Sequence, residues 1–481
     1  MNQPIPFDNS YARLPDGFFE HRVPSPSSAP QLIAVNDDLA RLLRIDPAFL
    51  RSADGLAMLA GNAVADGSEP IAAAYAGHQF GNFVTQLGDG RAILLGEVIG
   101  TDGIRRDIQL KGSGRTRWSR GGDGRAAIGP VIREYLVSEA MHALGVPTTR
   151  ALAAVTTGDA VLREDGPLPG AILARVAQSH LRVGTFEYFA ARNDTDALRT
   201  LADYAIARHY PDATEADHPY DALLRAVGAA QARLVARWMQ LGFIHGVMNT
   251  DNCAIGGETI DYGPCAFMDG FDPGKVFSSI DRGGRYAWAN QGRIAHWNLS
   301  RLAQALLPLL GDGEDGVTRA QAAVDTFPAL FEAAHVEGFS AKLGLRPGMT
   351  EPIDGVFSLM AEGRVDYTLF FRHLTVLAQG GSAQGLEALF ADTSALKEWL
   401  PSWQAALSED AGARMAEVNP IYIPRNHRVE AAIVAAQDGD FSVFERLGRV
   451  LAAPYTDRAD FTEFEAPPQP EEEVRRTFCG T

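Results

Sequence analysis

The sequence predicts an α+β protein with two lobes, the first built on a sheet and the second built from helices. Short β-rich runs joined by glycine-containing turns fill residues 82–112, a pattern typical of an antiparallel sheet. From about residue 186 the pattern becomes helical, and residues 221–242 carry apolar side chains at three- and four-residue steps, which favours a helix packed on one face. A motif rich in functional side chains, residues 245–269, follows that helix directly. We therefore expect the chemistry where the two lobes meet.

The first lobe is predicted to contain several strands and one long helix. Its expected elements are strands at 82–87, 91–100 and 104–112, a Gly- and Arg-rich loop at 112–130, a helix at 131–145 and a strand at 171–178. Gly145 and then Pro147 mark the end of the helix, because glycine suits a left-handed C-cap and proline does not continue a helix.

The whole chain is predicted to divide into four parts. They are an N-terminal extension, 1–70; a sheet-rich lobe with glycine-rich loops, 71–185; a helical lobe with a catalytic loop, 186–420; and a C-terminal extension and tail, 421–481. The N-terminal extension alternates Pro- and Gly-marked turns with short helical patterns, and we expect it to cover the sheet-rich lobe.

The composition argues against several classes of function. Lys and Arg number 43 against 60 Asp and Glu, so the net charge is −17, and this acidic balance disfavours a nucleic-acid or anionic-membrane surface. No run approaches the roughly 20 apolar residues of a membrane span, and the first residues lack the features of a signal peptide. Three cysteines are too few for a disulfide framework. We expect a cytoplasmic monomer without nucleic-acid or membrane partners.

Residues 245–263 resemble a protein-kinase catalytic loop with one position changed. A kinase loop has the pattern H-R-D-x-x-x-x-N and is followed by a metal-binding D-F-G. His245 and Asn252 keep that spacing, and Asp261 begins an Asp-Tyr-Gly in place of D-F-G. Val247 stands where the kinase base would be. We expect a protein-kinase-like fold in which His245 orients backbone and does not transfer protons.

Asn252 and Asp261 are the candidate metal ligands, because Mg²⁺ prefers hard oxygen donors and binds few protein groups beside phosphate oxygens. Asp251 is the candidate proton acceptor, since it adjoins Asn252 and its carboxylate can take a proton from an incoming hydroxyl. Both loop residues have structural alternatives. Asn252 can be a turn amide, and Asp251 can be an N-cap or Asx-turn carboxylate.

Lys111 is predicted to contact a phosphate and to be held by a glutamate, as in phosphoryl-transfer enzymes. It ends the expected strand 104–112, and the next helix offers both Glu134 and Glu139. Spacing alone therefore leaves its partner open. A Lys–Glu pair indicates little by itself, because surface ion pairs are common, and its place ahead of the 245–263 motif is what supports the prediction.

Glycines and arginines cluster in the loops of the first lobe. Gly88 and Gly90 stand beside Arg91, and glycines let the backbone approach a ligand closely. Further arginines follow along the chain: Arg115, Arg117, Arg120, Arg125, Arg175 and Arg182. In so acidic a chain this clustering predicts a polyanion pocket, because the guanidinium fork matches phosphate oxygens. The alternative for individual arginines is a solvated basic loop.

Long stretches of the chain resemble the selenoprotein O family, protein adenylyltransferases with a kinase-like fold. These stretches are 75–92, 109–141, 245–269, 290–306 and 419–433, so the resemblance covers nearly the whole chain. It implies transfer of AMP from ATP to Ser, Thr or Tyr hydroxyls of proteins, with Mg²⁺ or Mn²⁺ as cofactor and pyrophosphate as by-product. Candidate protein substrates include redox-related proteins and the enzyme itself.

The resemblance also implies that ATP binds inverted relative to a kinase. Arg175 and Arg182 would then contact a γ-phosphate deep in the pocket, and Glu134 would orient Lys111. The residues implied to contact the nucleotide are Gly88, Gly90, Arg91, Lys111, Asp123, Gly124, Arg175, Arg182 and Asp261. The metal would be held by Asn252 and Asp261, and Asp251 would accept the proton.

Two alternative functions stay open. Val247 in place of the base argues against γ-phosphoryl transfer in the usual orientation, but a conventional kinase with a displaced base is one alternative. A catalytically inactive nucleotide-binding scaffold is the other, although it would have little need for both Asn252 and Asp261.

Members of the resembled family often end in a cysteine or selenocysteine that pairs with a cysteine of the catalytic lobe. Cys479 supplies the terminal residue, but only Cys253 and Cys265 lie in the expected catalytic lobe, and 271–281 contains no cysteine. The sequence therefore gives an intramolecular regulatory disulfide little support.

Overall fold

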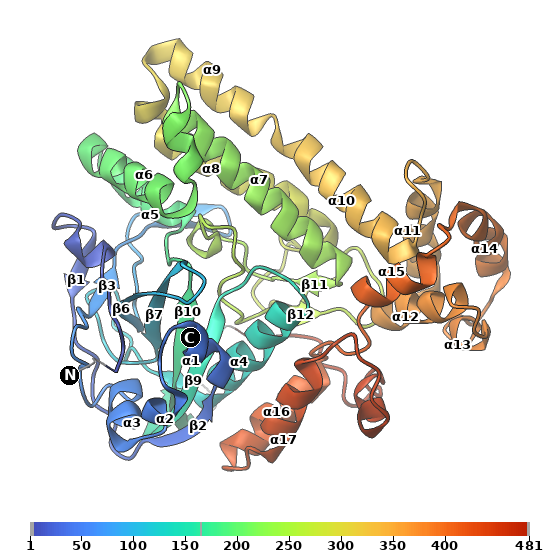
Figure 1. Cartoon of the computed structure of the whole chain (residues 1–481), viewed down its shortest axis with the longest axis horizontal. Helices are drawn as coiled ribbons and strands as arrows, with labels where there is room; N and C mark the ends of the chain where they lie inside the picture. The colour runs from blue at the N-terminus through green and yellow to red at the C-terminus, as the bar shows by residue number, and fades with distance from the viewer. Residues whose placement is uncertain (1–3, 164–165, 479–481) are drawn as a thin grey trace.

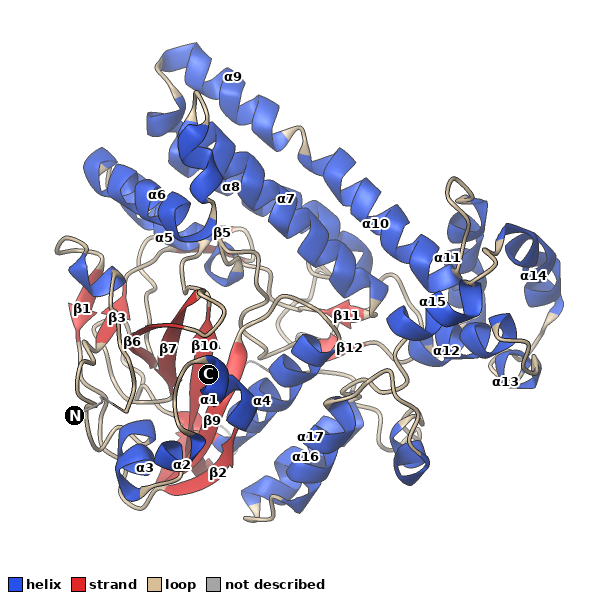
Figure 2. Ribbon diagram, in the orientation of Figure 1, coloured by secondary structure: helices blue, strands red, loops and turns tan. Residues whose placement is uncertain are grey.

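The protein is α+β, as the sequence predicts, and its main feature is one eight-stranded antiparallel sheet (Figure 1, Figure 2). The computed structural model describes residues 4–163 and 166–478. Its strands are β1 (Phe19–His21), β2 (Gln31–Val35), β3 (Ile71–Ala73), β4 (Gly77–Gln79), β5 (Asn82–Val84), β6 (Ala92–Ile99), β7 (Arg105–Lys111), β8 (Ala126–Ala127), β9 (Arg150–Arg163), β10 (Gly166–Ala177), β11 (Phe243–Ile244) and β12 (Ala266–Phe267). The sheet runs in the order β1-β3-β6-β7-β10-β9-β2, and β8 pairs with β10.

Helices make up most of the chain after the sheet. The α-helices before the 245–263 motif are α1 (Asp37–Leu42), α2 (Pro47–Leu50), α3 (Ala53–Leu59), α4 (Ile128–Ala143), α5 (Val183–Ala190), α6 (Thr195–His209) and α7 (Pro219–Gln240). Those after it are α8 (Gln291–Leu310), α9 (Gly313–Val324), α10 (Phe327–Leu343), α11 (Glu351–Gly363), α12 (Tyr367–Ala378), α13 (Gln384–Glu387), α14 (Ser394–Ala406), α15 (Ala411–Val418), α16 (Asn426–Gln437) and α17 (Ser442–Leu451). A short 3₁₀ turn, η3 (Thr250–Asn252), lies inside the motif.

The sheet is larger than the sequence predicts. The expected strands 91–100, 104–112 and 171–178 are confirmed as β6, β7 and β10. The long strand β9 was not expected, because its alanine-rich start shows no alternation of polar and apolar residues. The expected strand 82–87 is only partly right, since just its first three residues form β5, which pairs with β4 outside the main sheet.

The first 70 residues join the sheet as well as covering it. Strands β1 and β2 occupy its two ends, so β3 and β9 are not exposed edges that could pair with other chains. Successive residues of a strand point to opposite faces. On β10, Ala171 and Leu173 share a core with α4, whereas Ile172 and Ala174 share a core with α1–α3. Helix α4 and helices α1–α3 therefore cover opposite faces.

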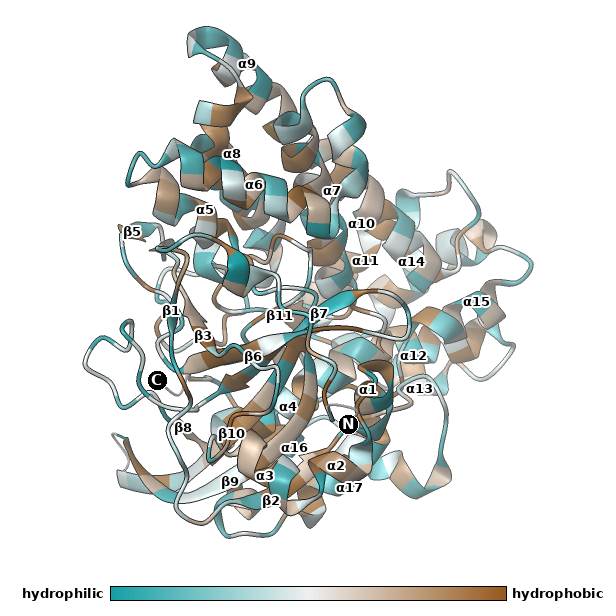
Figure 3. Cartoon of the chain, turned by 60° about the vertical axis from the view of Figure 1, so that its left-hand side comes forward, coloured by the Kyte–Doolittle hydropathy of each residue, from teal (hydrophilic) through white to brown (hydrophobic). Residues whose placement is uncertain are grey.

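The helical part packs around the long helix α7, which confirms the helix expected at 221–242. Helix α7 lies against α8 and α10, and α11–α15 lie to one side (Figure 1), where they share a second apolar cluster with the C-terminal end of α10. Figure 3 shows these helices banded in hydrophobic and hydrophilic colours, as expected of helices with one buried face. The expected helix 131–145 is confirmed as α4, which begins earlier, at Ile128.

The C-terminal extension packs back onto the rest of the chain. Helices α16 and α17 lie against α4 (Figure 1), and the tail returns to the segment after the Asp-Tyr-Gly. There the buried Thr477 donates its backbone N–H to the carbonyl of Phe277 at 2.8 Å. Within 4–163 and 166–478, no helix is both long enough and apolar enough to cross a membrane.

Candidate active site

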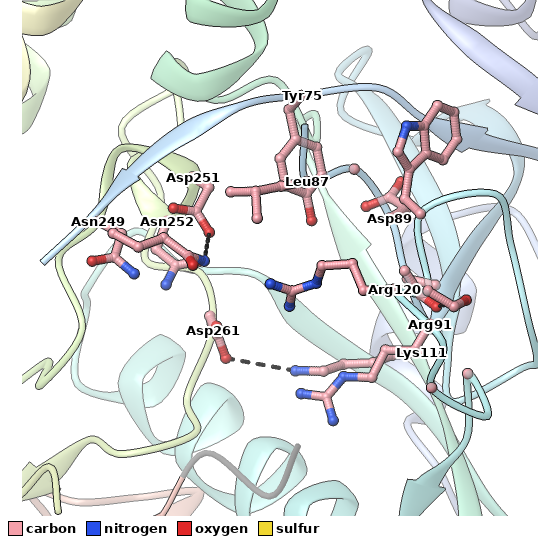
Figure 4. A pocket seen from close by; sticks show the side chains of 18 of the residues that line it. Tyr75, Leu87, Asp89, Arg91, Lys111, Arg120, Asn249, Asp251, Asn252 and Asp261 are labelled. Carbon is pink, nitrogen blue, oxygen red and sulfur yellow. Dashed lines mark hydrogen bonds and ion pairs between the residues drawn. The ribbon is translucent and has the colours of Figure 1, made fainter. Parts of the chain in front are cut away.

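A cavity of about 650 Å³ opens between the sheet and the 245–263 motif, a volume in the range of small-molecule sites. Strands β6, β7 and β10, the Gly- and Arg-rich loop and the motif all contribute to its walls (Figure 4). Eleven of the predicted site residues line it: Gly88, Gly90, Arg91, Lys111, Asp123, Gly124, Arg175, Arg182, Asp251, Asn252 and Asp261. Glu134 lies behind the wall and reaches the cavity through Lys111.

Strand register brings three polar side chains to one face of the sheet. Gln109 and Lys111 are two apart on β7, and Arg175 of β10 lies directly opposite Gln109, so all three point to the same side. Arg175 donates to the Gln109 side chain at 2.5 Å and to Glu134 Oε1 at 3.1 Å. Lys111 donates to the other Glu134 oxygen. One buried carboxylate therefore holds two buried cations in place.

The structure assigns Glu134, not Glu139, as the partner of Lys111. Glu139 instead accepts from Arg150 at 2.8 and 2.7 Å. Burial alone would raise the pKa of Glu134, but the charges of Lys111 and then Arg175 outweigh it, so the pKa lies below its usual value. Glu134 is therefore a fixed anion.

Asp261 points into the cavity from the opposite wall. Its Oδ1 lies 3.7 Å from Lys111 Nζ, and among the described residues this buried oxygen accepts no hydrogen bond. Burial would raise its pKa, but Lys111 and then Arg91 lower it well below the usual value. The φ of Asp261 is +71°, a left-handed conformation that a non-glycine residue holds only when its surroundings fix it. The neighbouring Tyr262, fully buried and hydrogen-bonded to Thr148, supplies such a constraint.

His245 is structural, in agreement with the expectation that it orients backbone. Its ring is fully buried, stacks on Trp238 at 5.1 Å and donates from Nε2 to the carbonyl of Ile260 at 2.9 Å. Val247 is buried and lines the cavity, and its carbonyl accepts from the Asn252 side chain at 3.1 Å. The position of the kinase base thus carries no proton acceptor.

Asp251 also lies on the motif side of the cavity, and no cation is bonded to its carboxylate oxygens. It is only 7% exposed, its Oδ2 accepts from the Gln79 amide at 3.3 Å, and its Oδ1 has no hydrogen-bond partner among the described residues (Figure 4). Burial raises its pKa to about 6. Asp251 can therefore both carry a negative charge near neutral pH and take up a proton.

Arg182 bridges the two ends of the cavity. It is buried beneath Tyr75, with its guanidinium 4.3 Å from the ring centre, and donates to the backbone carbonyl of Asp251 at 3.2 Å. Its other terminal nitrogen, Nη2, lies 3.5 Å from Asp89 Oδ1. Asp89 itself is buried and accepts from Gln109 at 3.2 Å.

The Gly- and Arg-rich loop forms the rim of the cavity. Gly88 has φ +82°, and a Cβ there would lie 2.3 Å from the Trp118 ring, so this close approach requires glycine. Gly124 has φ +69°, and a Cβ there would lie 2.2 Å from the backbone of Gly114. Asp123 is exposed and paired with Arg163 at 2.9 Å, which ties the loop to the β9–β10 hairpin.

The seven arginines singled out in the sequence divide into two groups. Those lining the cavity are Arg91, Arg120, Arg125, Arg175 and Arg182. Arg115 instead braces the loop by donating to the carbonyls of Gly121 and Gly122, and Arg117 is exposed and outside the lining. The alternative of a solvated basic loop therefore describes Arg115 and Arg117.

Several lining residues were not predicted individually. Among them are Tyr75, Gln79, Asp89, Trp118 and Asn249. Asp89 lies between the two glycines already singled out, and Tyr75 and Gln79 stand in a stretch quoted for the family resemblance, so proximity in sequence was a usable signal. Across 4–163 and 166–478 no three His, Cys, Asp or Glu side chains are grouped as metal ligands. Cys253 and Cys265 are buried free thiols, and Cys479 lies outside the described residues.

Comparison with known proteins identifies the family. Residues 3–452 match the family described as protein adenylyltransferase SelO. The chain is 59% identical over 490 residues to the protein nucleotidyltransferase YdiU of Nitrobacter hamburgensis, covering 99% of this chain and 97% of that protein. It is 57% identical over 492 residues to the protein nucleotidyltransferase YdiU of Bradyrhizobium sp. strain BTAi1, covering 100% of both. A third YdiU, from Rhodopseudomonas palustris strain HaA2, is 59% identical over 493 residues and 100% of both chains.

The cavity, with its buried cations and its carboxylates, thus belongs to an enzyme, and the class of that enzyme is nucleotidyltransferase. The chain belongs to the SelO family of protein adenylyltransferases.

Proposed function

We propose that the protein transfers AMP from ATP to Ser, Thr or Tyr hydroxyls of other proteins and releases pyrophosphate. We also propose that ATP binds with its γ-phosphate deep in the cavity, inverted relative to a kinase. The observation that carries this proposal is the division of the cavity into two ends. At one end lie Lys111 and Arg175, the buried cations that Glu134 holds. At the other end lies Asp251, a buried carboxylate whose oxygens are bonded to the Gln79 amide and to no cation.

The deep cations suit the terminal phosphates. Lys111 and Arg175 are 8% and 4% exposed, and Arg182 is 5% exposed, so they act in a poorly solvated environment where charge–charge attraction is strong. Guanidinium groups match phosphate oxygens in geometry. Held rigidly, these cations would stabilise the negative charge that builds on the departing pyrophosphate.

Asp251 would act at the α-phosphorus. The acceptor hydroxyl oxygen forms a bond to that phosphorus while the bond to the bridging oxygen of the pyrophosphate breaks, and the hydroxyl proton goes to Asp251. A carboxylate of raised pKa, bonded only to the Gln79 amide, has free lone pairs for that proton.

Asn252 and Asp261 would hold Mg²⁺ or Mn²⁺. The fit is supported by Asp261 Oδ1, a buried oxygen that accepts no hydrogen bond from the described residues, and by the preference of Mg²⁺ for one or two protein oxygens plus phosphates. When bound, the ion would neutralise phosphate charge. The residues Gly88, Gly90 and Gly124 would let the backbone approach the nucleotide, beside Arg91 and Asp123.

We further propose a protein-kinase-like, two-lobed arrangement for a monomer that works in the cytoplasm. The support for the fold is a strand lysine, Lys111, held by a helix glutamate, Glu134, and facing an Asp-Tyr-Gly that begins at Asp261. Redox-related proteins and the enzyme itself are candidate acceptors.

The test is incubation with ATP labelled at the α- or the γ-phosphorus, followed by intact-mass analysis of the enzyme and of added acceptor proteins. We expect label from the α position only and a mass gain the size of AMP. Label from the γ position only, with a phosphate-sized gain, would establish the kinase alternative instead. ATP binding without either gain, in the presence of Mg²⁺ or Mn²⁺ and a proteome-wide acceptor mixture, would favour the scaffold.

A further inference from the structure

A small hairpin, β4–β5, lies outside the main sheet and against the residues of η3. Three successive hairpin residues bond to three successive residues of the motif. His78 donates its backbone N–H to Thr250 Oγ1 at 2.6 Å, Gln79 donates its side-chain amide to Asp251 Oδ2 at 3.3 Å, and Phe80 donates its backbone N–H to Asn249 Oδ1 at 2.9 Å. Figure 4 shows the bond to Asp251 as a dashed line.

Helix α5 and the segment after the Asp-Tyr-Gly secure this contact from two sides. Glu187 of α5 is 5% exposed; its Oε1 bonds the His78 ring at 2.5 Å and its Oε2 accepts from the Thr250 hydroxyl at 2.5 Å. Tyr286 donates its hydroxyl to Asn249 Oδ1 at 2.7 Å. The hairpin, the helix and the motif therefore form one hydrogen-bonded unit.

The hairpin also contacts the second oxygen of Asp251. A Cβ on Gly77 would lie 2.7 Å from Asp251 Oδ1 and 3.0 Å from its Cβ, so the glycine backbone packs directly on the carboxylate. Gly77 has no unusual φ, and steric room is thus the reason for glycine here. Among the described residues, Gln79 is the one side chain that donates a hydrogen bond to the Asp251 carboxylate.

We propose that the β4–β5 hairpin is a clamp that sets the orientation of the Asp251 carboxylate, and that Gln79 is its positioning residue. This inference rests on the proposed role of Asp251 as proton acceptor. A carboxylate can rotate about its side-chain bonds, and reactive geometry must be held within about 0.5 Å. Gln79 fixes Oδ2, and Gly77 limits the motion of Oδ1. The two hydrogen bonds of Glu187, to the His78 ring and to the Thr250 hydroxyl, hold the hairpin and the loop together.

The first test compares two variants of Gln79 with a control on the same hairpin. Gln79→Ala removes the donor, and we expect kcat for group transfer to fall at least 10-fold while the KM for ATP and the melting temperature stay within error. Gln79→Glu has the same shape but sets a like charge against Asp251, so we expect a larger loss. Asn82→Ala is the control, because Asn82 pairs with Gln79 in the hairpin and is exposed, and it should leave kcat unchanged.

The second test uses Thr250, whose hydroxyl joins the hairpin to Glu187. Thr250→Val keeps the shape and loses the hydroxyl, and we expect it to lower kcat. Thr250→Ser keeps the hydroxyl and should restore most of the activity. A purely structural role would lower the melting temperature in proportion to kcat, and that result would overturn the clamp.

The outcomes also separate this inference from the proposed function. If the wild-type enzyme transfers label only from the γ-phosphate, the proposed function fails, but Gln79→Ala should still lower that transfer. If Asp251→Asn abolishes transfer while Gln79→Ala retains full kcat, the clamp is wrong and the role of Asp251 stands.

Discussion

The two ends of the cavity treat buried carboxylates in opposite ways. At the deep end, Glu134 is buried but contacts Lys111 and Arg175, and its pKa lies below the usual value. At the other end, Asp251 is almost as buried but has only an amide bonded to its oxygens, and its pKa is raised to about 6. Burial is common to both, so the neighbouring charge decides whether a carboxylate is a fixed anion or a group that can exchange a proton.

The largest expected effect is the loss of the reactive carboxylate. Asp251→Asn keeps the shape and removes the charge, and we expect kcat for AMP transfer to fall about 10²- to 10⁴-fold, the usual contribution of a general base. Rapid-quench measurement with α-labelled ATP checks this, and Asp221→Asn, which breaks a surface pair on α7, is the control. A kcat within threefold of wild type would show that proton transfer takes place elsewhere.

Loss of the fixed anion should act on stability as well as activity. Glu134→Gln leaves Lys111 and Arg175 buried without their carboxylate, and we expect the free energy of unfolding to fall by about 3–5 kcal/mol. Urea unfolding measures it. Glu463→Gln removes the exposed partner of Arg446 and should cost about 1 kcal/mol or less. Equal losses in the two variants would mean that the deep pair is no more important than a surface pair.

Glu258 offers a second buried carboxylate without a bonded cation, away from the cavity. It is 8% exposed, accepts from the backbone N–H of Gln178 at 2.9 Å, and burial raises its pKa to about 7. A raised folded-state pKa means that the folded protein holds the proton more tightly than the unfolded chain. Its contribution to stability is therefore fully present below about pH 4.5 and is lost as the pH rises through 7, by up to about 3 kcal/mol.

Glu258→Gln should remove that pH dependence. Urea unfolding of both proteins between pH 5 and 8 is the measurement, and the wild type should lose stability relative to the variant as the pH rises. A difference that is constant across this range would contradict the raised pKa.

The smallest effect is expected at the rim. Arg117 is exposed and does not line the cavity, so Arg117→Ala should change the KM for ATP less than twofold. Arg175→Ala, at the deep end, should raise it at least 10-fold because a buried, doubly held guanidinium is lost. Initial rates at varied ATP concentration compare the two, and similar shifts in KM would place the triphosphate at the rim.

Much of the fold could be predicted because local sequence patterns indicate its strands and helices. Strands β6, β7 and β10 and helices α4 and α7 follow from periodicity and turn residues. Strand β9 could not be predicted in this way, although its partner β10 follows it directly in the chain, because its alanine-rich start lacks the alternation of polar and apolar residues that marks a strand. The four-part division of the chain stays a prediction.

The residues of the site could also be predicted from the sequence, but the contacts between them could not. Eleven of the predicted residues line one cavity, yet the choice between Glu134 and Glu139 depended on which helix face meets β7. Gln79 was invisible as a contact of Asp251, because 172 residues separate the two.

From the residues alone one could know which side chains were available for phosphate chemistry and the order in which they occur. Three-dimensional packing settled which carboxylates face cations and which do not, and hence which one can take up a proton. The reason is that residue identity sets what a group can do, whereas desolvation and the charges around it set its pKa, and both depend on contacts between distant segments.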